Sequence, residues 1–180
     1  MLLVIRNAWI VTQDALRRIV KGDVVVDDGR IVSVGTAYTG SADVDIDASG
    51  DIVMPGMVNT HTHVAMSVLK GACDDLQFPD FLNRVFKIDS DRTDRDIDIG
   101  TRLGCMEMMR GGTTTFVDLY YSEDVIAKAV QDAGIRGVLC WCCLDEQFTT
   151  QKGDPVDNCK NFYEKHKAIR KIVPGVGLQG

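Results

Sequence analysis

The sequence lacks several features that mark common classes of protein. No apolar run approaches the roughly 18 residues that a membrane-spanning helix needs. Positive charge is scarce, since 26 acidic residues outnumber 20 basic ones and the formal net charge is −6. Nucleic acids and anionic membranes are bound by basic surfaces, so neither is expected as a partner. Arg6 and Asn7 interrupt the apolar start and no small-residue cleavage site follows, so we expect a cytoplasmic protein and not a secreted one.

The composition is that of a globular chain. Apolar residues make up 45% and charged residues 26% of the 180 positions, which excludes intrinsic disorder of the whole chain. Cys140 and Cys143 have the C-x-x-C spacing of many metal sites, but they lie in an apolar run, 137–144, that predicts a buried strand. Side chains three residues apart on a strand point to opposite faces. We therefore interpret these cysteines as small apolar packing residues in a reducing compartment.

Residues 1–54 predict a small antiparallel β-sheet. Within residues 24–34, two β-branched runs flank a turn that contains Asp28-Gly29, and an Asp-Gly pair is typical of a tight hairpin. Residues 44–47 alternate between apolar and acidic side chains, as a half-buried strand does. Pro55-Gly56 ends this region, and the pattern changes after it.

Residues 55–180 alternate between strand and helix patterns, which predicts βαβ units and a parallel sheet. The expected strands cover residues 57–60, 113–119, 137–144 and a last one that begins at 172. The expected helices cover residues 66–72, 78–87, 91–110, 123–132 and 159–171. Three complete units and the start of a fourth are present, whereas a closed (β/α)₈ barrel needs about 250 residues. The fold is either an open α/β sheet or part of a barrel, and a last strand with no helix after it favours part of a barrel.

His61 and His63 are the strongest candidates for chemistry. Alternate residues of a strand lie on the same side, and neutral imidazole is a common ligand of zinc. The pair follows a predicted buried strand, and parallel α/β proteins gather functional residues at the carboxyl ends of strands. The alternative is a pair of surface histidines in a loop.

Residues 55–63, Pro-Gly-Met-Val-Asn-Thr-His-Thr-His, resemble the signature of the amidohydrolase superfamily at the end of its first barrel strand. Further segments resemble the branch that holds S-adenosylhomocysteine, 5′-methylthioadenosine and 5′-deoxyadenosine deaminases and the triazine chlorohydrolases; they are residues 71–76, 81–82, 107–109, 112–118 and 134–136. The resemblance covers essentially the whole chain. It implies the (β/α)₈ TIM barrel of the metal-dependent hydrolases over residues 55–180, preceded by part of a small β-sandwich over residues 1–54.

The resemblance also implies an activity. One divalent metal ion, usually zinc or iron, activates water for attack on the ring carbon of an adenosine-type nucleoside, and ammonia leaves. The first two metal ligands of the family match His61 and His63. The remaining ligands and the acid–base residues come from later strands, so no catalytic residue is expected within these 180 residues, which alone are expected to be inactive. The third histidine, His166, lies in a lysine-rich stretch and is expected on the solvated surface.

Three further residues match substrate-contacting positions of the family. Phe81 replaces a tryptophan that forms a wall of the pocket, and Asp89 is the best match for an acidic residue that holds ribose hydroxyls. Trp141 lies where members that recognise an amino-acid carboxylate can have arginine, so a neutral 5′-substituted adenosine fits better than S-adenosylhomocysteine. The alternatives are core packing for Phe81 and Trp141, and a charge at a helix terminus for Asp89.

Other interpretations stay open. Asp118, at the end of the second expected strand of the barrel, is expected to cap the following helix, and the alternative is that it steadies the metal ligands. The protein could instead be a hydrolase of the same branch that acts on guanine, a triazine chloride or a cyclic amide. In another class, it could be a short, non-catalytic paralogue that binds a metal or a partner. The sequence decides neither the metal and the 5′ substituent nor the oligomeric state, for which a homo-oligomer is one outcome.

Overall fold

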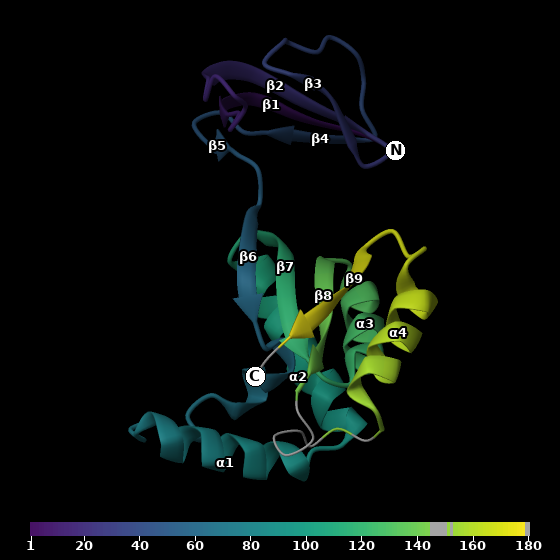
Figure 1. The fold of residues 1–180 in the computed structure, drawn as a ribbon. Coiled ribbons are helices and arrows are strands. Elements are labelled where there is room, and N and C mark those ends of the chain that lie inside the picture. The colour runs from purple at the N-terminus through teal and green to yellow at the C-terminus, as the bar shows by residue number, and fades with distance from the viewer. Residues whose placement is uncertain (145–150, 152, 179–180) are drawn as a thin grey trace. The chain divides into compact units, whose positions relative to one another are not determined.

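The computed structural model describes residues 1–144, 151 and 153–178 (Figure 1). The chain divides into two compact units, Met1–Pro55 and Gly56–Gly180. Each unit has a hydrophobic core of its own. Over the described ranges, no helix combines the length and the apolar character needed to cross a membrane.

The first unit is a five-stranded sheet in the order β3-β2-β1-β4, in which β5 also pairs with β1. Its strands are β1 (Leu2–Val11), β2 (Ile19–Asp27), β3 (Arg30–Val34), β4 (Val44–Asp47) and β5 (Ile52–Val53). The predicted hairpin joins β2 to β3, and both Asp28 and Gly29 have positive φ angles, 45° and 75°. That conformation suits the Asp-Gly pair, because glycine has no Cβ to clash there.

The expectation of a purely antiparallel sheet is wrong. β1 pairs in parallel with both β4 and β5, so the sheet is mixed. The segment after β3 returns the chain to the start of β1, where Leu3 pairs with Val44. The alternation in residues 44–47 predicts a strand but contains no information on its direction, which the preceding connection determines.

The second unit is an α/β fold with a parallel sheet in the chain order β6-β7-β8-β9, as predicted. Its strands are β6 (Met57–Thr62), β7 (Thr113–Tyr120), β8 (Arg136–Cys143) and β9 (Ile172–Leu178). Its helices are the 3₁₀ helix η1 (Val64–Leu69), α1 (Phe78–Ser90), α2 (Asp94–Arg110), α3 (Glu123–Ala133) and α4 (Pro155–His166). Figure 1 shows α3 and α4 beside the sheet, with α1 near the end toward which the strands run.

The core of the second unit lies between the sheet and its helices. Phe116 of β7, Leu139 of β8 and Phe162 of α4 are almost completely buried there. The six cysteines are free, and burial raises the pKa of Cys142 to about 11. A high pKa disfavours the thiolate that a metal would bind. Among the described residues, no three His, Cys, Asp or Glu side chains are arranged to hold a metal ion.

Candidate metal centre

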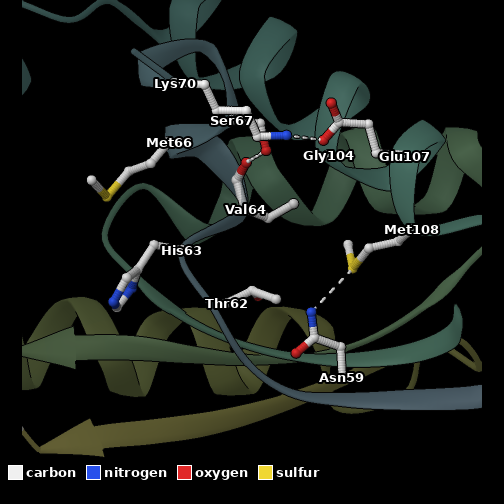
Figure 2. Close-up of a pocket in the computed structure, with 10 residues that line it drawn as sticks. All are labelled: Asn59, Thr62, His63, Val64, Met66, Ser67, Lys70, Gly104, Glu107 and Met108. Carbon is white, nitrogen blue, oxygen red and sulfur yellow. Dashed lines mark hydrogen bonds and ion pairs between the residues drawn. The ribbon is translucent and has the colours of Figure 1, made fainter. Parts of the chain in front are cut away.

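His61 and His63 lie at the carboxyl end of β6. Their ring centroids are 5.1 Å apart, with an angle of 79° between the ring planes. His61 is exposed and His63 is half-buried. Figure 2 shows His63 between the end of β6 and the start of η1, where it lines a pocket with Thr62 and Met66.

A hydrogen bond determines which ring nitrogen of His63 is available. Nδ1 of His63 lies 2.7 Å from the carbonyl oxygen of Leu119 in β7. A carbonyl oxygen only accepts, so Nδ1 carries the proton and Nε2 keeps a lone pair. This is the arrangement of a metal-binding histidine whose other nitrogen donates to a backbone carbonyl.

Asp118 of β7 is completely buried beside the histidine segment, residues 62–64. Its Oδ1 accepts hydrogen bonds from Thr62 Oγ1 at 2.6 Å and from the backbone N–H of Val64 at 2.7 Å. Burial raises the pKa of Asp118 to about 7, although these hydrogen bonds and His61 oppose the shift. The N-cap of α3 is Ser122, so the expectation that Asp118 caps that helix is wrong. Asp118 instead accepts hydrogen bonds from residues at the end of β6, the neighbouring strand of the sheet.

Glu123, which sequence reasoning missed, is the first residue of α3 and is also completely buried. Neither carboxylate oxygen has a hydrogen-bond partner within the described part of the chain. Burial, followed by the charge of Asp118, raises the pKa of Glu123 well above its ordinary value. An acidic residue in the first turn of a helix is common, so the pattern contains no signal that this one is buried.

A cavity of about 150 Å³ lies beside His63. Phe81 lines it, as do Leu119, Tyr121 and the edge of Asp89. No lysine or arginine is among the described residues around it. The cavity therefore suits an uncharged, mainly apolar group.

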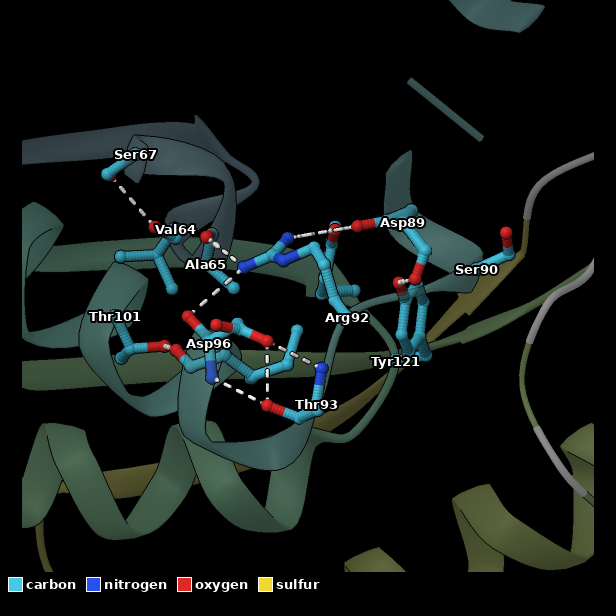
Figure 3. Close-up of polar contacts among 12 residues, drawn as sticks. Val64, Ala65, Ser67, Asp89, Ser90, Arg92, Thr93, Asp96, Thr101 and Tyr121 are labelled. Atoms are coloured by element: carbon cyan, nitrogen blue, oxygen red, sulfur yellow. Dashed lines mark hydrogen bonds and ion pairs between the residues drawn. The ribbon is translucent and has the colours of Figure 1, made fainter. Parts of the chain in front are cut away.

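The Asp89 carboxylate is engaged within the protein. Both of its oxygens lie within hydrogen-bond distance of the Tyr120 hydroxyl, at 2.5 and 2.7 Å, and Oδ1 accepts from Arg92 Nη1 at 2.9 Å. The Asp89 and Arg92 side chains are each 5% exposed. Figure 3 shows Arg92 extending from Asp89 toward the carbonyl oxygen of Ala65, to which it also donates.

Trp141 lies apart from the cavity at His63. Its ring packs against Phe162 at a centroid distance of 5.7 Å, and its Nε1–H donates to Gln151 Oε1 at 2.7 Å. It lines a second cavity, of about 460 Å³, together with Asp89. The structure thus brings Phe81 and Asp89 to His63 and leaves Trp141 on another cavity.

His166 is buried, so the expectation of a solvated surface position is wrong. It is 5% exposed, its Nε2 lies 2.7 Å from Asp124 Oδ1, and its ring packs on Phe162 at 4.6 Å. His166 follows Phe162 by four residues, and side chains at this spacing share one face of a helix. The lysines of the same stretch obscure that apolar face in the sequence.

The donors at the end of β6 fit a divalent metal ion in kind. The fixed tautomer leaves Nε2 of His63 free, and His61 is its neighbour. Two imidazoles are fewer than the three or four protein ligands that zinc takes. Among the described residues, no third His, Cys, Asp or Glu side chain is placed to complete such a group.

Comparison with known proteins places these features in a family. The chain is 42% identical over 154 residues to a 5′-deoxyadenosine deaminase of Methanosarcina mazei, a match that covers 84% of this chain and 35% of the relative. It is 40% identical over 173 residues to a 5-methylthioadenosine/S-adenosylhomocysteine deaminase of Thermococcus kodakarensis, covering 96% of this chain and 39% of the relative. The chain therefore spans little more than a third of the length of these curated relatives.

Solved structures share the fold. A zinc-bound adenosine deaminase from Xanthomonas campestris superposes with a TM-score of 0.87 at 23% identity, over 98% of this chain and 42% of that one. The model of the amidohydrolase family matches residues 52–177. This range includes His61, His63 and the four strands of the parallel sheet, except Leu178 at the end of β9. On this match, the chain belongs to the amidohydrolase family.

Proposed function

We propose that the full-length protein is a metal-dependent hydrolytic deaminase of adenosine-type nucleosides, in which His61 and His63 bind one divalent metal ion, zinc or iron. The observation that carries the proposal is the hydrogen bond from His63 Nδ1 to the Leu119 carbonyl, which leaves Nε2 available for a metal. The names of the relatives, 5′-deoxyadenosine deaminase and 5-methylthioadenosine/S-adenosylhomocysteine deaminase, support the substrate class.

We propose the same architecture for the whole protein as the family has. The parallel sheet would be the first half of a (β/α)₈ barrel that begins at residue 55, and residues 1–54 would be part of a β-sandwich. The two compact units are consistent with this division. Later strands would supply the remaining ligands and the acid–base residues.

The residues of this chain have separable tasks in such a reaction. When bound, the metal would supply Lewis acidity that makes hydroxide available near neutral pH, so that oxygen replaces the exocyclic amino group on the ring carbon and ammonia leaves. His61 and His63 hold the metal at the carboxyl end of the sheet. Phe81 forms an apolar wall of the cavity next to His63.

The substrate class follows from the same cavity. Its described lining has no lysine or arginine, so the carboxylate of a 5′ substituent placed there would lack a partner. The guanidinium of Arg92, which lines the second cavity, is already paired with Asp89, and a neutral 5′-substituted adenosine is therefore favoured. Asp89 and Trp141 remain proposed substrate contacts. A ribose hydroxyl at Asp89 would share the carboxylate with Tyr120, and Trp141 would contribute through the cavity that it lines with Asp89.

The test of the function is a substrate panel on the full-length protein loaded with zinc. Ammonia release is expected from 5′-deoxyadenosine and 5′-methylthioadenosine, with a lower kcat/KM for S-adenosylhomocysteine. Ammonia from guanine, or chloride from a chlorotriazine, with none from the adenosines would support another activity of the family. No turnover with any of them would favour the non-catalytic interpretation.

The ligand assignment makes a separate prediction. His61→Ala and His63→Ala should each remove stoichiometric zinc from the full-length protein, measured by elemental analysis, and abolish turnover. His166→Gln is the control, because His166 contacts Asp124 and Phe162 and neither histidine at the end of β6. This variant should keep its zinc. Retention of one zinc per chain in either alanine variant would contradict the assignment.

A further inference from the structure

Two consecutive residues at the end of β7 contact the histidine segment of β6. Asp118 Oδ1 accepts from Thr62 Oγ1 and from the N–H of Val64, the two residues on either side of His63. The carbonyl oxygen of Leu119 accepts from His63 itself. Thr62, His63 and Val64, at the junction of β6 and η1, are therefore bound by Asp118 and Leu119 of β7, and the Thr62 hydroxyl also contacts the Val117 carbonyl oxygen at 2.9 Å.

These bonds restrict His63 in different ways. The Leu119 carbonyl determines the tautomer and one direction of the ring. The Asp118 carboxylate determines the backbone on both sides, because Thr62 ends β6 and Val64 begins η1. The bonds from Thr62 and Val64 are 2.6 and 2.7 Å long. The bond from Val64 is buried and the bond from Thr62 is part-buried, and burial of the Asp118 acceptor limits competition from water.

We propose that Asp118 is a positioning residue for the metal centre, which holds His63 in its metal-binding orientation through Thr62 and Val64. The proposal rests on the proposed function in one respect only, that His63 is a metal ligand. It assigns Asp118 no contact with the metal or the substrate. The rival explanation is that these bonds stabilise the fold and leave metal binding unaffected.

Three variants separate the two explanations. Asp118→Ala removes the acceptor. Asp118→Asn keeps Oδ1 as an acceptor for both bonds. Leu139→Ala is the structural control, because Leu139 is completely buried and pairs with Asp118 across β7 and β8. Leu139 lies two strands away from the histidines, whereas Asp118 lies on the strand next to them. Its truncation should destabilise the unit by about 2–5 kcal/mol.

The experiment measures the dissociation constant of Zn²⁺ for the full-length variants by competition with a chelator, alongside urea unfolding of the zinc-free proteins. Asp118→Ala should raise the dissociation constant by about 10- to 100-fold. Asp118→Asn should stay within about threefold of the wild type, and Leu139→Ala should lose stability without losing zinc affinity. Equal zinc affinities for Asp118→Ala and Leu139→Ala would overturn the proposal.

Two further measurements keep the test decisive. If Asp118→Ala fails to fold, Thr62→Val removes the hydroxyl that donates to Asp118, together with its contact to the Val117 carbonyl, at nearly constant volume. This variant should raise the dissociation constant by about 3- to 10-fold. An unchanged constant in Thr62→Val would then count against the proposal. His63→Ala distinguishes the two levels of inference. If it binds zinc normally, the ligand assignment fails, whereas normal binding by the Asp118→Ala variant alone removes only the positioning role.

Discussion

Arg92 connects three elements around the candidate metal centre through its guanidinium group. It donates to Asp89 of α1, to the Tyr120 hydroxyl of β7 and to the Ala65 carbonyl of η1. The ion pair with Asp89 is buried on both sides. Removing one partner of such a pair leaves an uncompensated charge in a medium that solvates it poorly.

Arg92→Met should therefore destabilise the second unit by about 3–5 kcal/mol, because the Asp89 carboxylate stays buried without its cation. Urea unfolding of the variant measures the change. Arg102→Met is the matched control, because Arg102 pairs with Asp98 and Asp132 and its side chain is 43% exposed. An exposed pair contributes at most about 1 kcal/mol. Similar losses in the two variants would contradict the role given to burial.

At this scale, the sequence predicts residues whose chemistry is local. The H-x-H spacing and its place after a strand indicated His61 and His63. The partners of Asp89 and Asp118 could not be predicted, because Tyr120 and Thr62 are 31 and 56 residues away from them. His166 was misjudged, since the burial of one face of α4 depends on a sheet that the local pattern does not include.

Helix α2 packs against η1, which follows directly after His63, and two glycines make that approach close. A Cβ at Gly100 would lie 2.1 Å from the Ala65 carbonyl oxygen, and one at Gly104 would lie 2.6 Å from Ser67 Oγ. Ala65 also accepts from Arg92. The position of η1, which follows directly after His63, thus depends on the absence of a side chain at Gly100 and Gly104 of α2.

Gly100→Ala should destabilise the second unit by about 1–3 kcal/mol, because the methyl group meets a backbone atom that cannot rotate away. The higher helix propensity of alanine opposes this loss by about 1 kcal/mol. Gly111→Ala at the end of the same helix is the control, since the nearest atom to its Cβ would lie at 3.4 Å and its φ is negative. Thermal unfolding should show a clear loss only for the first variant, and equal Tm values would refute the packing argument.

Elements were predictable where the pattern is repeated and local. The parallel strands and the longer helices of the second unit follow from alternating apolar periodicity, and the hairpin at Asp28-Gly29 follows from turn chemistry. The direction of β4 does not follow from its own pattern, because the connection before it determines whether it pairs with β1 in parallel. The expected helix at residues 66–72 is the 3₁₀ helix Val64–Leu69, whose start is set by the bond from Val64 to Asp118.

Each of the two compact units contains a buried acidic residue, and the fold shifts the pKa values of these two residues in opposite directions. In the first unit, hydrogen bonds from the backbone N–H groups of Tyr38 and Asn7 hold the pKa of Asp23 below its ordinary 3.8. In the second unit, burial beside Asp118, Cys140 and Cys142 holds the pKa of Glu123 well above 4.5. The chain has two tryptophans, and they lie one in each unit, Trp9 in the first and Trp141 in the second. Each tryptophan can therefore report the unfolding of its own unit.

The direction in which pH changes the stability of each unit follows from the protonation state that the folded unit prefers. The folded first unit prefers the charged form of Asp23, so its contribution is complete above pH 3.8 and is lost as the pH falls through the lowered pKa. The folded second unit prefers the neutral form of Glu123, so its contribution is complete below pH 4.5 and is lost as the pH rises toward the raised pKa. Acidification from pH 7 to pH 5 should thus stabilise the second unit relative to the first.

Urea unfolding of the zinc-free 180-residue chain tests this, with Trp9→Phe and Trp141→Phe variants each leaving one tryptophan of that chain as reporter. Between pH 7 and pH 5, the midpoint reported by Trp141 should rise, while that reported by Trp9 should fall only when the pH drops below about 4. Glu123→Gln is neutral at every pH, so it should reduce the rise and leave the part that arises from Asp118, whose pKa is also raised. Asp23→Asn should flatten the acid loss of the first unit. If Glu123→Gln keeps the full pH dependence, then Glu123 binds protons alike in the folded and unfolded states, which would contradict a pKa raised by burial.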